Sequence, residues 1–89
     1  MTDADLRDQI VATVLDAVDG EFTAEDLELC GGSLRDAGMS SLAFLVFIEE
    51  LEIRFGVVIP PDVDPELLLT VDAVCGYVAG QKSKTVAGA

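Results

Sequence analysis

The segment from residue 41 to residue 55 constrains the fold more than any other, because it predicts one helix with few polar positions. Ser40 or Ser41 can begin this helix, and Gly56 follows it as a residue typical of a helix end. At about 100° per residue, one stripe of side chains is predicted to face the core. That stripe consists of Phe44, Ile48, Leu51 and Phe55.

The opposite face of the same predicted helix is also largely apolar. It carries Leu42, Val46 and Ile53 beside Glu49, with Ala43 and Glu50 flanking. A helix that is apolar nearly all round is either covered on both sides or presents a contact surface. Both interpretations stay open: the preceding segment can fold over part of this face, and the face can dock partner proteins.

The rest of the chain predicts a small all-α bundle of three main helices and one short helix. With 89 residues, the chain makes one domain. A first amphipathic helix is expected over residues 4–18, capped by Thr2 or Asp3 and ended by Gly20. Asp64 and Pro65 predict the start of a short helix through residue 69, and a last helix is expected over about 71–78. We expect the folded domain to span residues 1–81 and a flexible tail to span residues 82–89.

A long first loop, about residues 19–39, connects the first two long helices. Loops of this length are uncommon in compact domains, and they are functional or are held down by their own apolar residues. Four side chains are expected to pin this loop to the core: Phe22, Leu27, Leu29 and Leu34.

Charge and composition exclude several classes of function. Five Lys and Arg against seventeen Asp and Glu give a net charge of −12, which disfavours nucleic acid and anionic membranes and favours basic protein partners. The same charge also serves simply to keep a small hydrophobic domain soluble. No apolar run approaches the roughly 20 residues of a bilayer span, and the acidic N-terminus lacks a secretion-signal pattern, so we expect a cytoplasmic protein.

The two cysteines and the missing histidines limit the chemistry further. Without His, neither a Ser–His–Asp nor a Cys–His catalytic site can form. Cys30 and Cys75 are too few for a disulfide framework or a zinc site. We expect Cys75 to be a small core residue and Cys30 to be a partly exposed thiol in a Gly-rich turn.

Four landmarks along the chain resemble the acyl and peptidyl carrier protein family. They are Leu-Arg-Asp-Ala-Gly-Met-Ser-Ser-Leu at residues 34–42, Arg-Phe-Gly-Val-Val-Ile-Pro at residues 54–60, Thr70-Val71 and Tyr77-Val78. Their order and spacing extend the resemblance over roughly residues 4–80. The resemblance implies a non-catalytic helical carrier domain. It would hold an acyl or aminoacyl group as a thioester on a covalent 4'-phosphopantetheine arm derived from coenzyme A.

Two serines compete for the attachment of that arm. Gly31-Gly32-Ser33-Leu34 superficially resembles the Gly-Gly-x-Ser-Leu signature of peptidyl carriers. In the family, however, the attachment serine precedes the Phe of the Phe-Gly landmark by about four helical turns. Ser41 lies 14 residues before Phe55, whereas Ser33 lies 22 residues before it. The resemblance therefore makes Ser41 the attachment residue, ahead of its neighbour Ser40, and leaves Ser33 as a turn or capping residue.

Ser40 departs from the family pattern, which usually has Asp at this place. The resemblance implies that this Asp helps to hold the metal ion used by the phosphopantetheinyl transferase. Ser40 remains a good helix cap but supplies no charge, so arm installation is expected to be slower or to need a particular transferase. An unmodified, carrier-like interaction module is the alternative that this departure supports.

The expected docking surface also departs from the pattern of fatty-acid carriers. Ala43 and Val46 stand where many of those carriers have acids, so recognition should use more apolar side chains and the later glutamates. The docking residues predicted are Leu42, Val46, Glu49, Glu50 and Ile53. This pattern favours a discrete carrier of polyketide or nonribosomal peptide biosynthesis, such as an antibiotic pathway, over a general fatty-acid acyl carrier protein.

The implied partners are enzymes that load, modify or unload the arm. They are a phosphopantetheinyl transferase, an acyltransferase or adenylating loading enzyme, and a ketosynthase or condensation enzyme. We expect a monomer with no nucleic-acid, membrane or metal partner. Asp62, Asp64 and Glu66 suggest an acidic metal-binding protein as a further hypothesis. Their spacing lacks the central Gly and final Glu of a calcium loop, and a helix-capping role explains Asp64 better.

Overall fold

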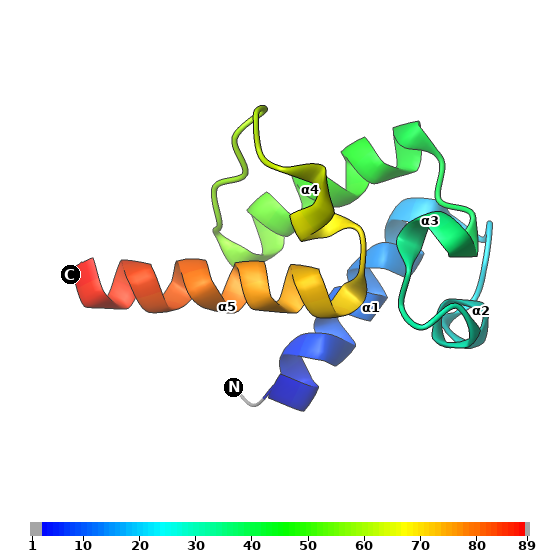
Figure 1. Cartoon of the computed structure of the whole chain (residues 1–89), viewed down its shortest axis with the longest axis horizontal. Coiled ribbons are helices and arrows are strands. Elements are labelled where there is room, and N and C mark those ends of the chain that lie inside the picture. Colours follow the sequence, from blue (N-terminus) through cyan, green and yellow to red (C-terminus); the bar gives the residue numbers. More distant parts are fainter. Residues whose placement is uncertain (1–2, 89) are drawn as a thin grey trace.

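The computed structural model describes the backbone of residues 3–88 and the side chains of residues 4–81. Within that range the chain forms helices and no strand, which confirms the all-α class (Figure 1). The three long helices are α1 (Asp3–Val18), α4 (Ser41–Phe55) and α5 (Val71–Gly88). The short ones are α2 (Ala24–Leu29), α3 (Leu34–Ala37) and the 3-10 helix η1 (Pro65–Leu68).

The core lies where α1 packs against α4 and α5, and η1 closes it by packing against α5. The side chains with the least exposure come from all of these elements, and most are aliphatic. They include Ile10, Val14, Val18, Phe47, Leu51, Leu68, Val71, Val74 and Val78. None of the helices in the described part of the chain has the length and apolar character needed to cross a bilayer.

The buried face of α4 is rotated from the predicted one. Phe47 and Leu51 are fully buried, whereas Phe44 and Ile48 are only half-buried. The predicted positions of Leu51 and Phe55 in the core are confirmed, and Ala43 completes the buried stripe. Both the predicted and the observed stripes follow helical spacing. Because the helix is apolar nearly all round, the sequence does not indicate which stripe is buried. The packing of α1 on α4 selects the stripe that contains Phe47.

The segment from residue 19 to residue 39 is more ordered than the predicted loop, because it contains α2 and α3. Thr23 caps α2 and forms a reciprocal capping box with Asp26. Phe22, Leu27 and Leu34 are buried, as expected. The expectation for Leu29 is wrong: its side chain is 79% exposed, because Leu27 occupies the inward face of α2 and Leu29 points away from it.

Two backbone hydrogen bonds join this segment to the start of α5. The Leu34 N–H donates to the Leu69 carbonyl, and the Val71 N–H donates to the Gly32 carbonyl, both at 2.9 Å. They form an isolated antiparallel bridge between Ser33 and Thr70. Figure 1 shows α2 and α3 together at one end of the bundle.

The connection after α4 is extended, as its prolines predict. Gly56 ends α4 with a φ of 66°, and its N–H donates to the Glu52 carbonyl. The connection is tied to α5, because the Tyr77 hydroxyl donates to the Val58 carbonyl at 3.0 Å. At its far end, the Asp64 carboxylate accepts from the Glu66 N–H and Pro65 is the first residue of η1, which confirms the predicted cap.

The last helix is longer than predicted. Its backbone continues from Val71 to Gly88, well past the expected end near Val78. The sequence after Gly80 contains no proline that would stop a helix. The division into a domain of residues 1–81 and a tail of residues 82–89 stays a prediction, since side chains beyond Gln81 lie outside the described residues. Thr2, one of the two expected caps of α1, also lies outside them.

Candidate functional site

Ser41 is the first residue of α4, and its side chain is exposed. Ser40 directly before it is the N-cap: its Oγ accepts the Ala43 N–H at 3.1 Å, and its carbonyl accepts the Phe44 N–H at 2.9 Å. Gly38 ends α3 with a φ of 104°, a left-handed conformation that suits glycine. This turn lets the chain pass from α3 into α4 within a few residues, and it leaves Ser41 at the surface.

The start of α4 retains unpaired hydrogen-bond donors next to Ser41. Ser40 satisfies the N–H groups of Ala43 and Phe44, but those of Ser41 and Leu42 donate to no residue among those that the structure describes. Free N–H groups and the positive end of the helix dipole both favour an anion at such a position. The contribution is about 0.3–1 kcal/mol at an exposed site.

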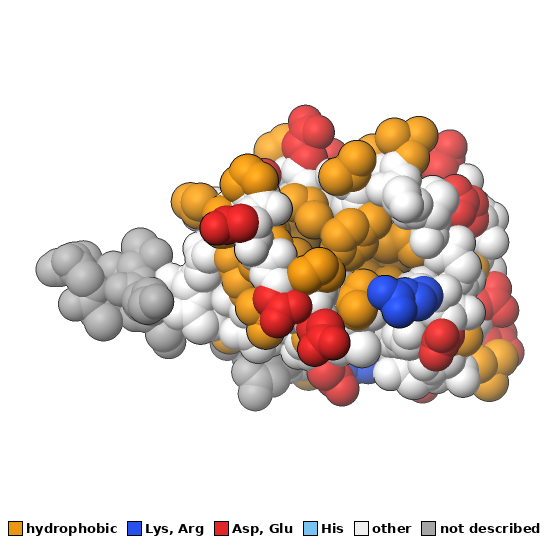
Figure 2. Space-filling view, turned by 45° about the horizontal axis from the view of Figure 1, so that its top comes forward, with side chains coloured by type: hydrophobic (Ala, Val, Ile, Leu, Met, Phe, Trp, Pro, Cys, Tyr) orange, Lys and Arg blue, Asp and Glu red, His pale blue; other side chains and the backbone are white. Residues whose placement is uncertain are grey.

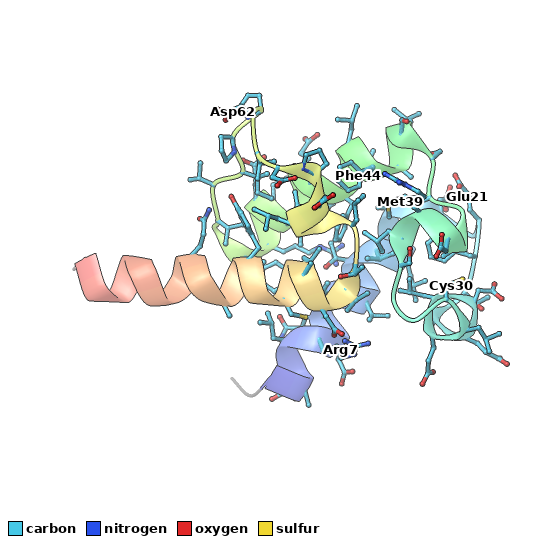
Figure 3. All side chains as sticks on the ribbon, viewed as in Figure 1. Arg7, Glu21, Cys30, Met39, Phe44 and Asp62 are labelled. Atoms are coloured by element: carbon cyan, nitrogen blue, oxygen red, sulfur yellow. The ribbon has the colours of Figure 1, made fainter. Side chains whose placement is uncertain are left out.

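A groove of about 370 Å³ opens beside Ser41, and we call it the Ser41 groove. It lies between α3, the first turns of α4, and η1 with the residue that follows it. Its lining residues are Leu34, Arg35, Met39, Ser40, Ser41, Phe44, Leu45, Pro65 and Leu69. Figure 2 shows a hollow lined mostly by hydrophobic side chains, with a basic side chain at its edge. Figure 3 labels Met39 and Phe44, which lie near the junction of α3 and α4.

The charges around the Ser41 groove differ from those of the rest of the molecule. No acidic side chain lines it, although the chain carries a net charge of −12. Arg35 lines it and has no ion-pair partner among the described side chains. By contrast, Arg7 pairs with Asp72 on the surface, where α1 meets α5.

Arg54 is the third arginine, and its role is structural. Its guanidinium contacts Asp16 of α1 at 2.6 Å and Glu50 of α4 at 3.0 Å, and it donates to the Thr13 hydroxyl. The hydrogen bond to Asp16, aided by the one to Glu50, raises the pKa of Arg54 above its ordinary value. Arg54 therefore holds α1 and α4 together and is not available to a ligand at Ser41.

The predicted docking residues fall into two groups. Leu42, Val46, Glu49 and Ile53 lie at the surface, with Leu42 73% and Ile53 69% exposed. Glu50 is half-buried and is held by Arg54, so it is less accessible than predicted. Leu45 was missed by the sequence prediction, although it is 64% exposed. It was missed because the predicted core stripe, although right for Leu51 and Phe55, placed Phe44 and Ile48 in the core where the structure has Ala43 and Phe47. We define the α4 outer face as Leu42, Leu45, Val46, Glu49 and Ile53.

Ser33, the competing serine, is a capping residue, as predicted. Its Oγ accepts the Asp36 N–H at 3.2 Å at the start of α3, and its backbone forms the bridge to Thr70. Its side chain is half-buried, and the helix that follows it has only four residues. Ser33 and Ser41 thus differ in exposure and in the length of the helix at whose start each lies.

Neither cysteine belongs to a cluster of chemically active side chains. Within the part of the chain that the structure describes, neither Cys30 nor Cys75 forms a disulfide, and both are half-buried. Cys75 packs against the core, as expected, and Cys30 follows α2 in the Gly-rich turn. Among the described residues, no group of three or more Cys, Asp or Glu side chains is arranged to hold a metal ion. Asp64, part of the metal hypothesis, serves as the cap of η1.

These features fit a covalently attached, phosphate-linked arm. Ser41 offers an exposed hydroxyl for a phosphodiester bond, and the free N–H groups of Ser41 and Leu42 face the region where the resulting anion would form. The Ser41 groove adds apolar contact area beside that bond. The chain has no histidine, and no Asp, Glu, Lys or Tyr side chain is among the residues that line the Ser41 groove.

Comparisons with known proteins agree with this geometry. Neither the search of curated proteins nor the search of solved structures found a match. A protein-family model, however, described as a phosphopantetheine attachment site, matches residues 8–78, which is most of the chain. Domains of this family carry covalently attached 4'-phosphopantetheine and are generally non-catalytic. The match runs from within α1, through α2, α3, α4 and η1, to the middle of α5, and the chain therefore belongs to the family of phosphopantetheine-carrying carrier domains.

Proposed function

We propose that this chain is a discrete cytoplasmic carrier of polyketide or nonribosomal peptide biosynthesis, with its arm attached at Ser41. The observation that carries the attachment site is the placement of Ser41 as the exposed first residue of a 15-residue helix. The thiol at the end of the arm supplies the chemistry, because it holds an acyl or aminoacyl group as a thioester. The chain's own residues present the hydroxyl, stabilise the phosphodiester and dock the partner enzymes.

The choice of pathway rests on the α4 outer face. Of the two positions where many fatty-acid carriers have acids, Ala43 is buried and only Val46 lies on this face. Val46, with Leu42 and Leu45, makes the surface next to Ser41 apolar, and Glu49 supplies charge one turn farther along. This surface suits partner enzymes with an apolar contact patch near the arm's entry, and it suits a general fatty-acid system less well.

The partners are inferred from this role. A phosphopantetheinyl transferase would install the arm, an acyltransferase or an adenylating enzyme would load it, and a ketosynthase or condensation enzyme would use its cargo. A second candidate function is an unmodified carrier-like interaction module. The observation that favours it is Ser40, which caps α4 where the family usually has a metal-binding Asp.

Intact-mass measurement separates these two functions. The purified apo protein is incubated with coenzyme A, Mg²⁺ and a broad-specificity phosphopantetheinyl transferase, in parallel with Ser41→Ala and Ser33→Ala. We expect the wild type and Ser33→Ala to gain the mass of the arm and Ser41→Ala to gain none. A gain that survives Ser41→Ala would overturn the attachment site, and no gain in any protein would favour the interaction module.

The pathway is tested by the cargo. Mass spectrometry of the protein purified from its native host reads the group that remains on the arm's thiol. We expect a polyketide, aminoacyl or peptidyl intermediate. A mixture of saturated fatty acyl chains of many lengths would instead identify a general fatty-acid carrier.

A further inference from the structure

Arg35 is the feature of the site that the proposed function does not explain. It lies in the last turn of α3 and lines the same groove as Ser41. Of the three arginines that the described range contains, Arg7 and Arg54 are ion-paired, whereas Arg35 has no carboxylate partner within that range. In a chain with 17 acidic residues, a cation beside an acid-free groove indicates a site suited to an anion.

A purely structural role explains Arg35 poorly. Cationic side chains near a helix C-terminus interact favourably with the helix dipole, and Arg35 has this position. However, α3 has only four residues, so its dipole is small, and the Arg35 carbonyl already accepts a hydrogen bond from the Gly38 N–H at 3.0 Å. The guanidinium is therefore free to contact a group bound in the groove.

The phosphodiester that links the family's cofactor to the serine is an anion that would form next to this groove. Ser41 itself lines the groove, so a phosphodiester bonded to its side-chain oxygen would be held at the groove. A guanidinium presents its donors in a planar fork that matches two phosphate oxygens, which makes arginine the preferred cation for such groups. The branched aliphatic carbons that follow the phosphodiester in the arm need apolar contacts, and Met39, Phe44 and Leu69 provide them in the same groove.

We propose that the Ser41 groove holds the inner part of the arm, with Arg35 paired to the phosphodiester. By the inner part we mean the phosphodiester and the branched carbons next to it. The groove volume of about 370 Å³ is near the lower end of the range of about 300–1,000 Å³ that is typical of small-molecule sites. In this arrangement the inner arm lies in the groove, and the thiol end with its cargo extends beyond it, where partner enzymes reach them. This inference rests on the proposed attachment at Ser41.

The test uses the arm-bearing forms of the wild type, Arg35→Gln, Arg35→Lys and a matched control, Arg7→Gln. The control removes the same charge from a surface pair outside the Ser41 groove, and Arg7 lies well apart from Met39 and Phe44 in Figure 3. The ³¹P NMR signal of the phosphodiester is recorded at about 10 mM and about 1 M salt, where the Debye length falls from about 30 Å to about 3 Å.

At low salt we expect the Arg35→Gln signal to be displaced from that of the wild type, with Arg35→Lys between them and Arg7→Gln superimposed on the wild type. High salt should remove these differences, because an exposed ion pair is screened. Coincident signals for the wild type and Arg35→Gln at low salt would overturn the proposal. An equal displacement in Arg7→Gln would also overturn it, because the effect would then be one of net charge.

A second measurement needs no variant. In the ¹⁵N-labelled wild type, the Arg35 Nε–H signal should move when the apo protein is converted to the arm-bearing form, while the Arg54 Nε–H signal should stay in place. An unmoved Arg35 signal contradicts the proposal. The two hypotheses fail in different ways: absence of a mass gain overturns the attachment at Ser41, whereas a mass gain with an unmoved Arg35 signal overturns only the role of Arg35.

Discussion

Two substitutions of Ser40 test separately the stability of α4 and the rate of arm installation. Ser40→Ala should change only the stability, and Ser40→Asp should change mainly the rate. The Ser40 Oγ accepts the Ala43 N–H at 3.1 Å, so Ser40→Ala removes the cap of α4. Loss of an N-cap costs about 0.5–2 kcal/mol. Since domains have roughly 0.05–0.15 kcal/mol of stability per residue, 89 residues provide about 4–13 kcal/mol, and the variant stays folded. Each kcal/mol lost lowers Tm by about 4–8 °C in a domain of this size.

Ser40→Asp should behave in the opposite way. Aspartate caps helices as well as serine does, and its charge interacts favourably with the N-terminus, so Tm should be equal or higher. It also supplies the carboxylate that the family usually places before the attachment serine. We therefore expect faster arm installation in Ser40→Asp, whereas Ser40→Ala should be modified at the wild-type rate, because neither serine nor alanine provides charge.

The assay combines thermal unfolding by far-UV circular dichroism with time-resolved intact mass, in which coenzyme A, Mg²⁺ and the transferase are supplied at fixed concentrations. Both rates are measured below the Tm of the least stable variant. If Ser40→Asp is modified no faster than the wild type, the missing carboxylate does not limit the reaction of this chain. If Ser40→Ala unfolds at the wild-type temperature, the capping bond does not stabilise α4.

Three further predictions test the packing and the docking surface. Phe47→Ala should lower the free energy of unfolding, measured in urea, by about 3–5 kcal/mol, because Phe47 is fully buried. Phe44→Ala should lower it clearly less, because Phe44 is half-buried. Equal losses would contradict the observed orientation of α4. Val46→Asp should slow turnover by the cognate loading or condensing enzyme while changing stability by less than about 0.5 kcal/mol, and normal turnover would exclude this part of the α4 outer face from docking. Gly56→Ala should cost about 1–2 kcal/mol, because its φ of 66° is unfavourable for residues with a Cβ, and an unchanged urea midpoint would contradict that reasoning.

The sequence predicts the helices better than it predicts how they are oriented. The limits of α4 follow from Ser40 and Gly56, whose capping preferences are local and need no tertiary information. The buried face of α4 does not follow, because the apolar positions surround the helix and only the contact with α1 decides between Phe44 and Phe47. The helix α2 was hidden for a related reason: six residues are too few to show a clear periodicity.

The candidate site was predictable in one part only. The position of Ser41 at the start of the helix that ends at Phe55 is confirmed, whereas its role as the attachment residue, which the family resemblance implies, stays a prediction. The Ser41 groove was not predictable, since its walls come from segments more than twenty residues apart, such as Arg35 and Leu69, which tertiary structure brings together. Leu45 was equally hidden, because its exposure depends on the orientation of α4.

The pair of backbone hydrogen bonds between the segment before α3 and the segment after η1 determines how the Ser41 groove can open. Leu34 and Leu69, which line two of its walls, are joined to each other through one of these bonds. These bonds couple the two walls to each other, so we expect the groove to widen mainly through a shift of the first turn of α4 away from them. If the inner arm lies in the groove as proposed, a partner enzyme that draws it out should displace the first turn of the helix that bears Ser41, while the Leu34 and Val71 amides should stay protected from hydrogen exchange.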